Sequence, residues 1–339
     1  MKIELIPEQG NFYKVNLHCH TNLSDGKHTP EEIKELYKKQ GYSAVCFTDH
    51  EVLIPHEDLN DDGFIALHGY EMAIKKEPEK STGYFMPVYH FNFIAEDQGN
   101  RIMPRCYLNS SSSYVNGRYW REALKPYDPN DTIDHTEYSI EWINDYLSAV
   151  KNAGYLITYN HPQWSLHTME DYIGLEHLHA IEVINGGCAA MQDNTSLHFE
   201  QMLRHGMDVV PVGGDDNHSI AECFTGWTVI KAPELTYDAL IAAYKRGDCY
   251  ASEGPEILSL TYEDGEIVVK TSPAARIALR TEGRLTAKIK DENAELTEAR
   301  FVYTPEKFGR YLRVEVKDAK GRFAYSRAYS TAQIQEKLQ

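Results

Sequence analysis

The sequence is poor in positive charge, in closely spaced cysteines and in long hydrophobic runs. Lys and Arg number 34 against 51 Asp and Glu, which gives a formal net charge of −17 at pH 7. Because Lys and Arg drive nucleic-acid binding by displacing counterions from phosphates, this balance argues against a nucleic-acid duplex as partner and against an anionic membrane surface. If several of the acidic residues bind cations, the loaded protein is less negative than its sequence.

The cysteine pattern and the hydrophobic pattern bear on the compartment. The six cysteines include no C-x-x-C pair and form no dense framework, which in a chain of 339 residues is typical of reduced thiols. The N-terminal residues show no apolar signal segment, and no stretch approaches the ~20 apolar residues of a membrane span. We therefore expect a cytoplasmic protein with no membrane partner.

Short apolar runs that end in polar residues recur through the first three quarters of the chain. Their β-branched and aromatic residues, bounded by Gly, Pro, Asn or Asp, predict buried strands. Helical patterns lie between them, at 29–41, 139–153, 191–205 and 235–246. Strands that alternate with helices predict parallel βα units and a barrel or barrel-like sheet. The predicted strands are Val15–His20, Ala44–His50, Phe64–Glu71, Met86–Phe93, Tyr155–Pro162, Ala180–Gly186 and Asp208–His218.

Two regions break this rhythm. Residues 96–138 are long, polar and aromatic, and we interpret them as an insertion that is either a lid over one end of the barrel or a variable surface loop. From residue 255 onward, apolar and polar residues alternate around Asp-Gly, Glu-Gly and Lys-Gly turns, which predicts a small antiparallel β-domain. The expected division is a metal-hydrolase barrel at 1–254 and a small β-sandwich-like domain at 255–339.

Nine residues with metal-binding side chains lie at or near the ends of the predicted strands or, for Asp25, in the loop that follows one. A single histidine on an apolar strand is more often a core residue than a ligand. A whole set at or near the C-terminal ends of strands, where parallel α/β folds place active sites, predicts a metal cluster instead. Imidazole and carboxylate are both good ligands of divalent transition metals. The candidates are His18, His20, Asp25, His50, Glu71, His90, His161, Asp216 and His218.

The order of these motifs resembles the polymerase and histidinol phosphatase (PHP) superfamily of metal-dependent phosphoesterases. The motifs are H-x-H-T followed by S-D-G, then T-D-H, G-x-E, H, N-H-P and D-x-H, and the resemblance covers roughly residues 11–255 except the insertion. It implies a distorted (β/α)7 barrel with a di- or trinuclear metal centre. The barrel followed by a C-terminal β-tail is similar to the subgroup with carbamate-hydrolase-like members.

The resemblance also implies which residues share each ion. The first site would use His18, His20, Glu71 and Asp216; the second Asp25, His50 and His218; the third Glu71 as a bridge with His90 and His161. The spacing to His218 selects Asp216 rather than Asp215, although an exchange between the two stays open. The ions would be two or three Mn, Fe or Zn, and the carboxylate of Asp25 favours Mn or Fe(II) at the second site.

The expected function is a metal-dependent phosphoesterase that hydrolyses a small phosphorylated metabolite or nucleotide through a metal-bridging hydroxide. Asp216 and His218 are the candidate catalytic residues, with either His218 or a metal-bound water as proton donor to the leaving group. Arg101, Arg105, Arg118 or Arg121 would bind phosphate if the insertion covers the cleft; otherwise these arginines are surface residues. The alternatives are a hydrolase of a carbamate, amide or carboxylic ester, and a non-catalytic metal-binding module. The oligomeric state is left open.

Overall fold

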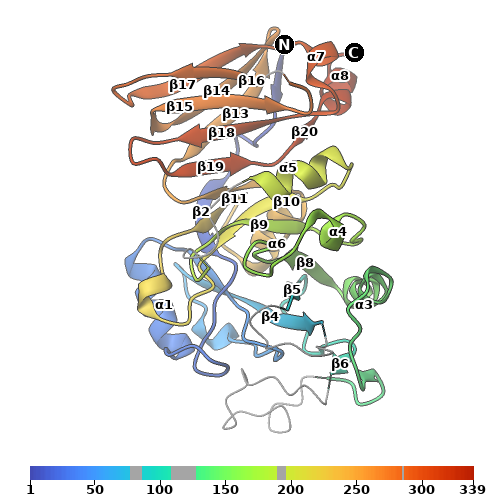
Figure 1. Ribbon diagram of the computed structural model, residues 1–339. Coiled ribbons are helices and arrows are strands. Elements are labelled where there is room, and N and C mark those ends of the chain that lie inside the picture. Colours follow the sequence, from blue (N-terminus) through green and yellow to red (C-terminus); the bar gives the residue numbers. More distant parts are fainter. Residues whose placement is uncertain (77–85, 108–126, 189–195, 285) are drawn as a thin grey trace.

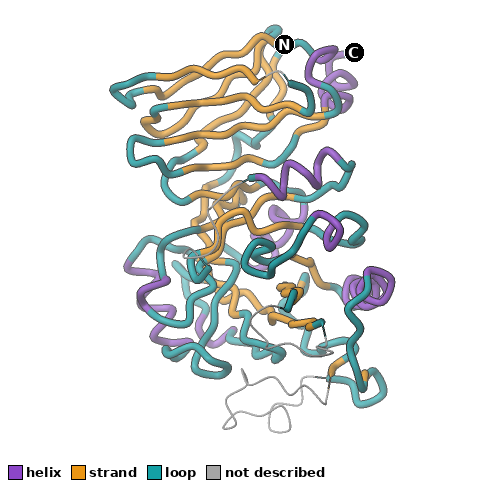
Figure 2. Tube along the Cα trace, in the orientation of Figure 1, coloured by secondary structure: helices purple, strands orange, loops and turns teal. Residues whose placement is uncertain are grey.

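The computed structural model describes residues 1–76, 86–107, 127–188, 196–284 and 286–339. The fold is mixed α/β, with one large sheet, a smaller four-stranded sheet and helices around the large sheet (Figure 1). Helices and strands alternate in the lower part of the view, whereas the upper part, which holds both chain ends, is mostly strand (Figure 2).

The strands predicted from the short apolar runs form the first part of the large sheet. They are β2 (Asn11–Asn16), β3 (Ala44–Phe47), β4 (Ile65–Lys75), β5 (Val88–Ala95), β8 (Tyr155–Tyr159), β9 (Ala180–Asn185) and β10 (Val210–Gly214), followed by β11 (Trp227–Ala232) and β12 (Cys249–Ser252). Their spatial order is β10-β9-β8-β5-β4-β3-β2-β11-β12. The pairs among β2, β3 and β4, and among β8, β9 and β10, are parallel, but β5 is antiparallel to both β4 and β8. The prediction of uniformly parallel units is therefore wrong at β5.

The helices begin and end close to the predicted signals. The main ones are α1 (Pro30–Lys39), α3 (Ile140–Asn152), α5 (Leu197–Arg204) and α6 (Tyr237–Lys245), with short elements η1 (Glu57–Leu59), α4 (Met169–Tyr172) and η3 (Ile220–Glu222). At α1 the predicted capping box is confirmed, because Thr29 and Glu32 each accept a backbone hydrogen bond from the other. Gly41 follows this helix at a φ of +76°, a conformation that glycine adopts without strain. The first residues predicted for the helix at 191–205 lie outside the described residues.

The large sheet curls around one hydrophobic core. A single cluster of buried side chains contains residues from all nine of these strands and from α6. Where the curled sheet meets itself, the Thr228 hydroxyl of β11 accepts from the Gly213 amide of β10 and donates to the Gly213 carbonyl oxygen. The described residues form no backbone ladder between β10 and β11, so a closed (β/α)7 barrel stays a prediction.

The C-terminal strands form two antiparallel layers that share a second core. One layer is β1 (Lys2–Glu4), β13 (Ile257–Glu263), β14 (Glu266–Ala274) and β17 (Leu296–Val302); the other is β15 (Arg276–Thr281), β16 (Thr286–Lys290), β18 (Tyr311–Lys317) and β19 (Phe323–Ser326), with β20 (Tyr329–Ser330), α7 (Pro305–Phe308) and α8 (Thr331–Leu338) beside them. Because β12 pairs with both β11 and β19, the second layer continues the large sheet. The first strand of the chain pairs with β13, and the division at residue 254 stays a prediction.

A buried ion pair joins α5 to β18. Arg313 is fully buried, and its guanidinium donates to the carboxylate of Glu200 from Nε at 2.9 Å and from Nη2 at 2.7 Å. The Tyr311 hydroxyl donates to the other oxygen of the same carboxylate at 2.8 Å. A planar guanidinium that binds a carboxylate in this way fixes both distance and angle. The contact therefore holds the C-terminal layers against the part of the sheet that carries β9 and β10.

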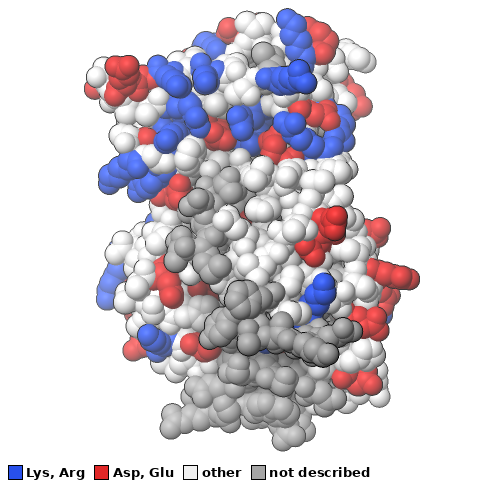
Figure 3. All heavy atoms as spheres, in the orientation of Figure 1, with Lys and Arg blue, Asp and Glu red and all other residues white. Residues whose placement is uncertain are grey.

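The charges are unevenly distributed over the chain. The acidic excess lies in residues 1–254, whereas Lys and Arg slightly outnumber Asp and Glu in residues 255–339. Figure 3 shows Lys and Arg side chains gathered over the C-terminal layers. A shallow pocket in this part of the chain is lined by Arg276, Lys290, Lys317 and Lys320 among others. Net charge thus disfavours anionic partners only for the first part of the chain. Among the described residues, no helix has the length and apolar character needed to cross a membrane.

We expect Glu200→Ala to lower the free energy of unfolding by about 3 kcal/mol, because the buried Arg313 loses both of its close bonds to a carboxylate and, among the described acidic residues, keeps only the ion pair with Glu315 at 3.8 Å. Chemical denaturation would measure this loss. The matched control is Glu336→Ala on the exposed face of α8, which should change stability by less than about 0.5 kcal/mol. Equal stability of the two variants would show that the ion pair does not hold the layers together.

Candidate metal centre

All nine candidate residues come together at one edge of the curled sheet. His18 and His20 follow the end of β2, His50 follows β3, His161 follows β8, and Asp216 and His218 follow β10. The prediction placed His18 and His20 on the strand itself, but β2 ends at Asn16. The two rings still share one side of the extended chain, and Cys19 between them packs into a core cluster with Val45 and Phe47. Alternation therefore persists beyond the last ladder hydrogen bond.

Glu71 and His90 lie at this edge, but their positions on their strands differ from the predicted ones. Glu71 does not end its strand, because β4 continues to Lys75. His90 is the third residue of β5, near the beginning of that strand rather than its end. Since β5 runs antiparallel to β4 and β8, its beginning lies beside the ends of those strands. The reversal of β5 is what brings His90 to the cluster.

The innermost group consists of His18, His20, Glu71 and Asp216, which are all buried. The Nε2 atom of His20 lies 3.0 Å from Asp216 Oδ1 and 3.3 Å from Glu71 Oε2. The Nε2 atom of His18 lies 3.2 Å from Asp216 Oδ1 and 3.3 Å from Glu71 Oε1. The four donor atoms lie within 4.8 Å of one another, so they could bind one ion in common.

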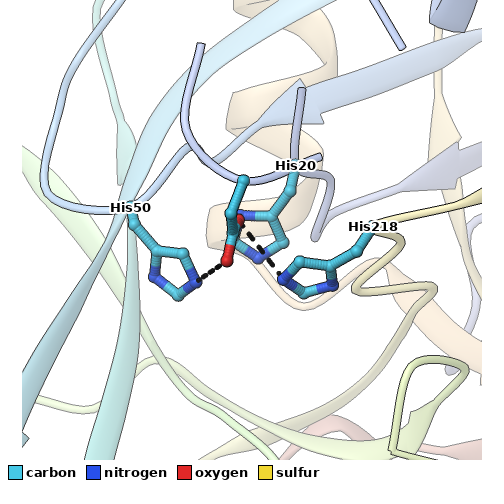
Figure 4. Close-up of side chains that lie close together, drawn as sticks. His20, His50 and His218 are labelled. Carbon is cyan, nitrogen blue, oxygen red and sulfur yellow. Dashed lines mark ion pairs between the residues drawn. The ribbon is translucent and has the colours of Figure 1, made fainter. Parts of the chain in front are cut away.

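A second group surrounds Asp25, next to the first. His50 Nε2 lies 3.6 Å from Asp25 Oδ2, and His218 Nε2 lies 3.4 Å from Asp25 Oδ1. Figure 4 shows the rings of His20, His50 and His218 arranged around this carboxylate, whose ion pairs to His50 and His218 are dashed. The Nδ1–H of His218 donates to the Asp216 carbonyl oxygen at 3.0 Å. Since a carbonyl only accepts, Nε2 of the neutral ring keeps its lone pair for the site, as a metal ligand requires.

The third group shares Glu71 with the first. His90 Nδ1 lies 3.0 Å from Glu71 Oε1, and His161 Nε2 lies 3.5 Å from the same oxygen. The other oxygen of Glu71 lies 3.1 Å from His50 Nδ1. Glu71 is fully buried and contacts histidines of all three groups. This is the position that a bridging carboxylate would take.

Surrounding side chains orient the candidate ligands. Glu182 of β9 accepts from His18 Nδ1 at 2.7 Å and from the backbone amide of His161 at 3.1 Å. Asn185 donates to Glu182 at 2.9 Å and to Asp216 at 3.2 Å. A carboxylate that holds the remote ring nitrogen of a histidine fixes the tautomer whose other nitrogen faces the metal. Both residues were visible in the sequence at the end of the predicted strand, but no motif marked Glu182 as a partner of His18.

The adjacent acidic residues Asp215 and Asp216 have different surroundings. Asp215 is buried outside the cluster, where it accepts from the Tyr37 hydroxyl at 2.8 Å and from the amides of Phe224 and Thr225 at 2.8 Å each. Asp216 therefore lies in the cluster, whereas Asp215 binds the backbone of the loop that follows η3. Asp49 has a similar supporting position, because it accepts from Thr21 and Ser24 in the loop that carries Asp25.

Backbone geometry at the site is unusual. Asp216 has a φ of +49° and His161 a φ of +24°, a region that residues other than glycine seldom occupy. Beside them, a Cβ atom on Gly214 would lie 2.8 Å from the His18 Cβ atom. A side chain at position 214 would therefore displace His18, which explains the glycine at the end of β10.

The cluster has strongly shifted pKa values. Burial opposes protonation of His20, but hydrogen bonds to Asp216 and Glu71 outweigh it and raise the pKa of His20 to about 10. Burial and the neighbouring His20 charge lower the pKa of His50 to about 3. For Glu71, burial raises the pKa, but the adjacent histidine charges outweigh burial and hold it well below its usual range. Protons on imidazoles thus balance the buried carboxylates where cations would otherwise do so.

The residues fit a set of divalent cations. His20 Nδ1 and His90 Nε2 are buried polar atoms with no hydrogen-bond partner among the described residues. Buried polar atoms of this kind are rare unless a ligand or water satisfies them. A mixture of imidazole nitrogens and carboxylate oxygens suits Mn, Fe(II) and Zn. The geometry therefore supports a site for more than one divalent cation.

An open pocket of about 100 Å³ leads to the cluster. Its lining includes His50, Glu71, His90, His161, Asp216 and His218 from the predicted set, together with Trp164, Gly187 and Cys188, which the sequence reasoning missed. The described lining contains no Lys or Arg. Arg101 and Arg105 instead form ion pairs with Glu57 and Asp145, and Arg118 and Arg121 lie outside the described residues.

Comparison with known proteins yields one family match. Residues 16–154 match the PHP domain family. This PHP match includes His18, His20, Asp25, His50, Glu71 and His90, and it ends before His161, Asp216 and His218. No curated protein was found to match the chain.

Several solved structures are similar to this chain at low identity. A two-domain protein from Bacteroides vulgatus that contains a predicted PHP-like metal-dependent phosphoesterase is 13% identical, with 96% of this chain and 98% of that chain covered and a TM-score of 0.46. An amidohydrolase from Chromobacterium violaceum is 17% identical, with coverages of 61% and 88% and a TM-score of 0.38. A lesion-specific endonuclease from Pyrococcus furiosus is 15% identical, with coverages of 70% and 56% and a TM-score of 0.39. These scores are too low to carry an argument about activity.

We expect Glu182→Gln to weaken Zn binding by about 10–100-fold, the usual effect of removing a group that orients a metal-bound histidine. Competition with a chromophoric chelator would measure the change. The matched control is Glu176→Gln, whose side chain is 69% exposed and outside the cluster. If both variants bind Zn as tightly as the unmodified protein, Glu182 does not orient a ligand.

Metal uptake should release protons. With the pKa of His20 near 10, its ring is protonated at neutral pH in the cation-free protein, and a ligand must lose that proton. We therefore expect Zn affinity to rise with pH between about 6 and 8. Calorimetric titration in buffers of different ionisation enthalpy would count the released protons. Zn binding that neither changes with pH nor releases protons would contradict this interpretation of the cluster.

Proposed function

We propose that the protein is a metal-dependent phosphoesterase of the PHP superfamily that hydrolyses a small phosphorylated metabolite or nucleotide. The observation that carries the proposal is the fully buried Glu71 carboxylate, which contacts histidines of three adjoining ligand groups at the base of an open pocket. The PHP match over residues 16–154 supports it. A distorted (β/α)7 barrel and two or three Mn, Fe or Zn ions belong to the same proposal.

The division of labour in the pocket follows from the side chains. When bound, divalent cations neutralise phosphate oxygens and activate water for attack on phosphorus. Glu71 and Asp216 hold the innermost positions, while Glu182 and Asn185 keep His18 and Asp216 in place. Because His218 Nδ1–H is committed to the Asp216 carbonyl and Nε2 faces Asp25, we assign His218 as a ligand rather than as the proton donor.

The pocket also bears on how a substrate would bind. It offers about 100 Å³ of space at the cluster, which would take a phosphate-sized group rather than a whole ligand. Trp164 forms one wall, with its ring centre 4.9 Å from that of His161 and 5.3 Å from that of His90. Its flat apolar face would contact the organic part of the substrate, while the phosphate faces the cluster.

One observation favours a second candidate, a hydrolase of carbamates, amides or carboxylic esters. A phosphomonoester at neutral pH carries nearly two negative charges, and sites for it usually include Arg or Lys. The described pocket lining has neither. A neutral substrate would need only the cations and the histidines.

The proposal predicts metal-dependent release of phosphate from an aryl phosphate or a nucleotide. Protein stripped with a chelator should be inactive, and Mn, Zn or Fe(II) should restore it. We expect Asp216→Asn to lower kcat/KM by more than about 100-fold, since even groups that only orient ligands contribute 10–100-fold. His135→Gln, on an exposed loop, is the control and should keep full activity.

Aryl carbamates and carboxylic esters form the second arm of the same assay. If the metal-loaded protein hydrolyses them and shows no phosphatase activity across a broad panel of phosphates, the second candidate replaces the first. If it hydrolyses neither class, the enzymatic proposal fails and a metal-binding module without activity is left.

A further inference from the structure

Cys188 lines the pocket that leads to the cluster, although the cysteine pattern predicts only a reduced thiol. It follows β9 after a turn through two glycines, is 5% exposed, and lines the pocket together with His161 and Asp216. Its Sγ atom, a His161 ring nitrogen and an Asp216 carboxylate oxygen lie within 4.8 Å of one another. The thiol is thus one of three donors that face the same space.

The spacing of these donors matches a shared cation. The Cys188 thiol donates to Asp216 Oδ2, with Sγ 3.7 Å from that oxygen. His161 Nε2 also lies 3.7 Å from the same oxygen, which is beyond hydrogen-bonding distance for a nitrogen. Ligands about 2.0–2.3 Å from a tetrahedral ion are separated from each other by roughly 3.5 Å. His161 is 1% exposed, and its Nδ1 atom faces the Ser165 hydroxyl, which leaves Nε2 for this space.

The turn before Cys188 is held in place by the same side chain that supports Asp216. The side-chain oxygen Oδ1 of Asn185 accepts from the backbone amide of Cys188 at 2.9 Å. The side-chain nitrogen Nδ2 of Asn185 donates to Asp216 Oδ2 at 3.2 Å. A Cβ atom on Gly187 would lie 2.4 Å from the Asp216 carbonyl oxygen, so only glycine allows this close approach. Asn185 therefore fixes Cys188 and Asp216 relative to each other.

We propose that Cys188 is a thiolate ligand of a cation shared by Asp216 of the first group and His161 of the third group, an inference that rests on the metal centre of the proposed function. On binding, the S–H bond breaks, its proton passes to solvent, and a sulfur–metal bond forms, with no change of oxidation state. A thiolate is a softer ligand than a carboxylate, so this position selects Zn or Fe(II) over Mn. The group around Asp25 has only nitrogen and oxygen donors, so its ligand set is harder than that of His161, Cys188 and Asp216.

Cobalt(II) is the probe that tests this ligation, because a cobalt–thiolate bond adds a charge-transfer absorption in the near ultraviolet to the visible bands of bound cobalt. The unmodified protein should show both features. Cys188→Ser and Cys188→Ala should keep the visible bands and lose the near-ultraviolet absorption, and each should lower the preference for Zn over Mn by about tenfold or more. Cys223→Ser is the matched control, since that thiol is also buried but bonds to the Ser219 carbonyl away from the cluster.

The outcomes separate the two proposals. Visible cobalt bands without the near-ultraviolet absorption in the unmodified protein would overturn the ligation by Cys188 and leave the metal centre intact. The same absorption in the Cys188 variants would assign it to another thiol and would also overturn the inference. Absence of all cobalt bands, with the protein folded by circular dichroism, would contradict the metal centre itself and the thiolate ligand with it.

Discussion

A carboxylate that is completely buried needs positive charge beside it, and this requirement organises the whole site. Glu71 has no exposed surface, and an isolated ionised carboxylate in such a place would cost several kcal/mol. The protein meets the requirement by surrounding Glu71 with imidazole rings from different strands. Without cations, protons on rings such as His20 supply the charge; with cations, the same nitrogens become ligands.

The fold places the rings around Glu71 by combining two strand directions. Most of the cluster comes from the ends of parallel strands, which any parallel sheet brings to one edge. Glu71 stands in the middle of β4, and β5 runs back alongside it so that His90 contacts its carboxylate from the other side. The buried Arg313–Glu200 pair then joins the C-terminal layers to α5, next to β9, the strand that carries Glu182. Stability and ligand geometry are therefore linked through the same part of the sheet.

The sequence predicted much of this arrangement because strand ends and metal-binding residue types leave a local signature. The apolar runs before His50, His161 and Asp216 located three of the strands, and Thr29 with Glu32 located the start of α1. The direction of β5 was predicted wrongly, because an apolar run looks the same in either direction and only its pairing partners decide. Glu182 and Cys188 were missed for a related reason: their roles depend on contacts with His18 and Asp216, far away in the chain.

A crystal structure of the metal-loaded protein, with anomalous data at the edges of Mn, Fe and Zn, tests the central claim most directly. The account predicts at least two anomalous peaks inside the cluster, with the Glu71 carboxylate bound to more than one ion. One peak away from Glu71, or a cluster that binds no metal when crystals are grown with these ions, would contradict it.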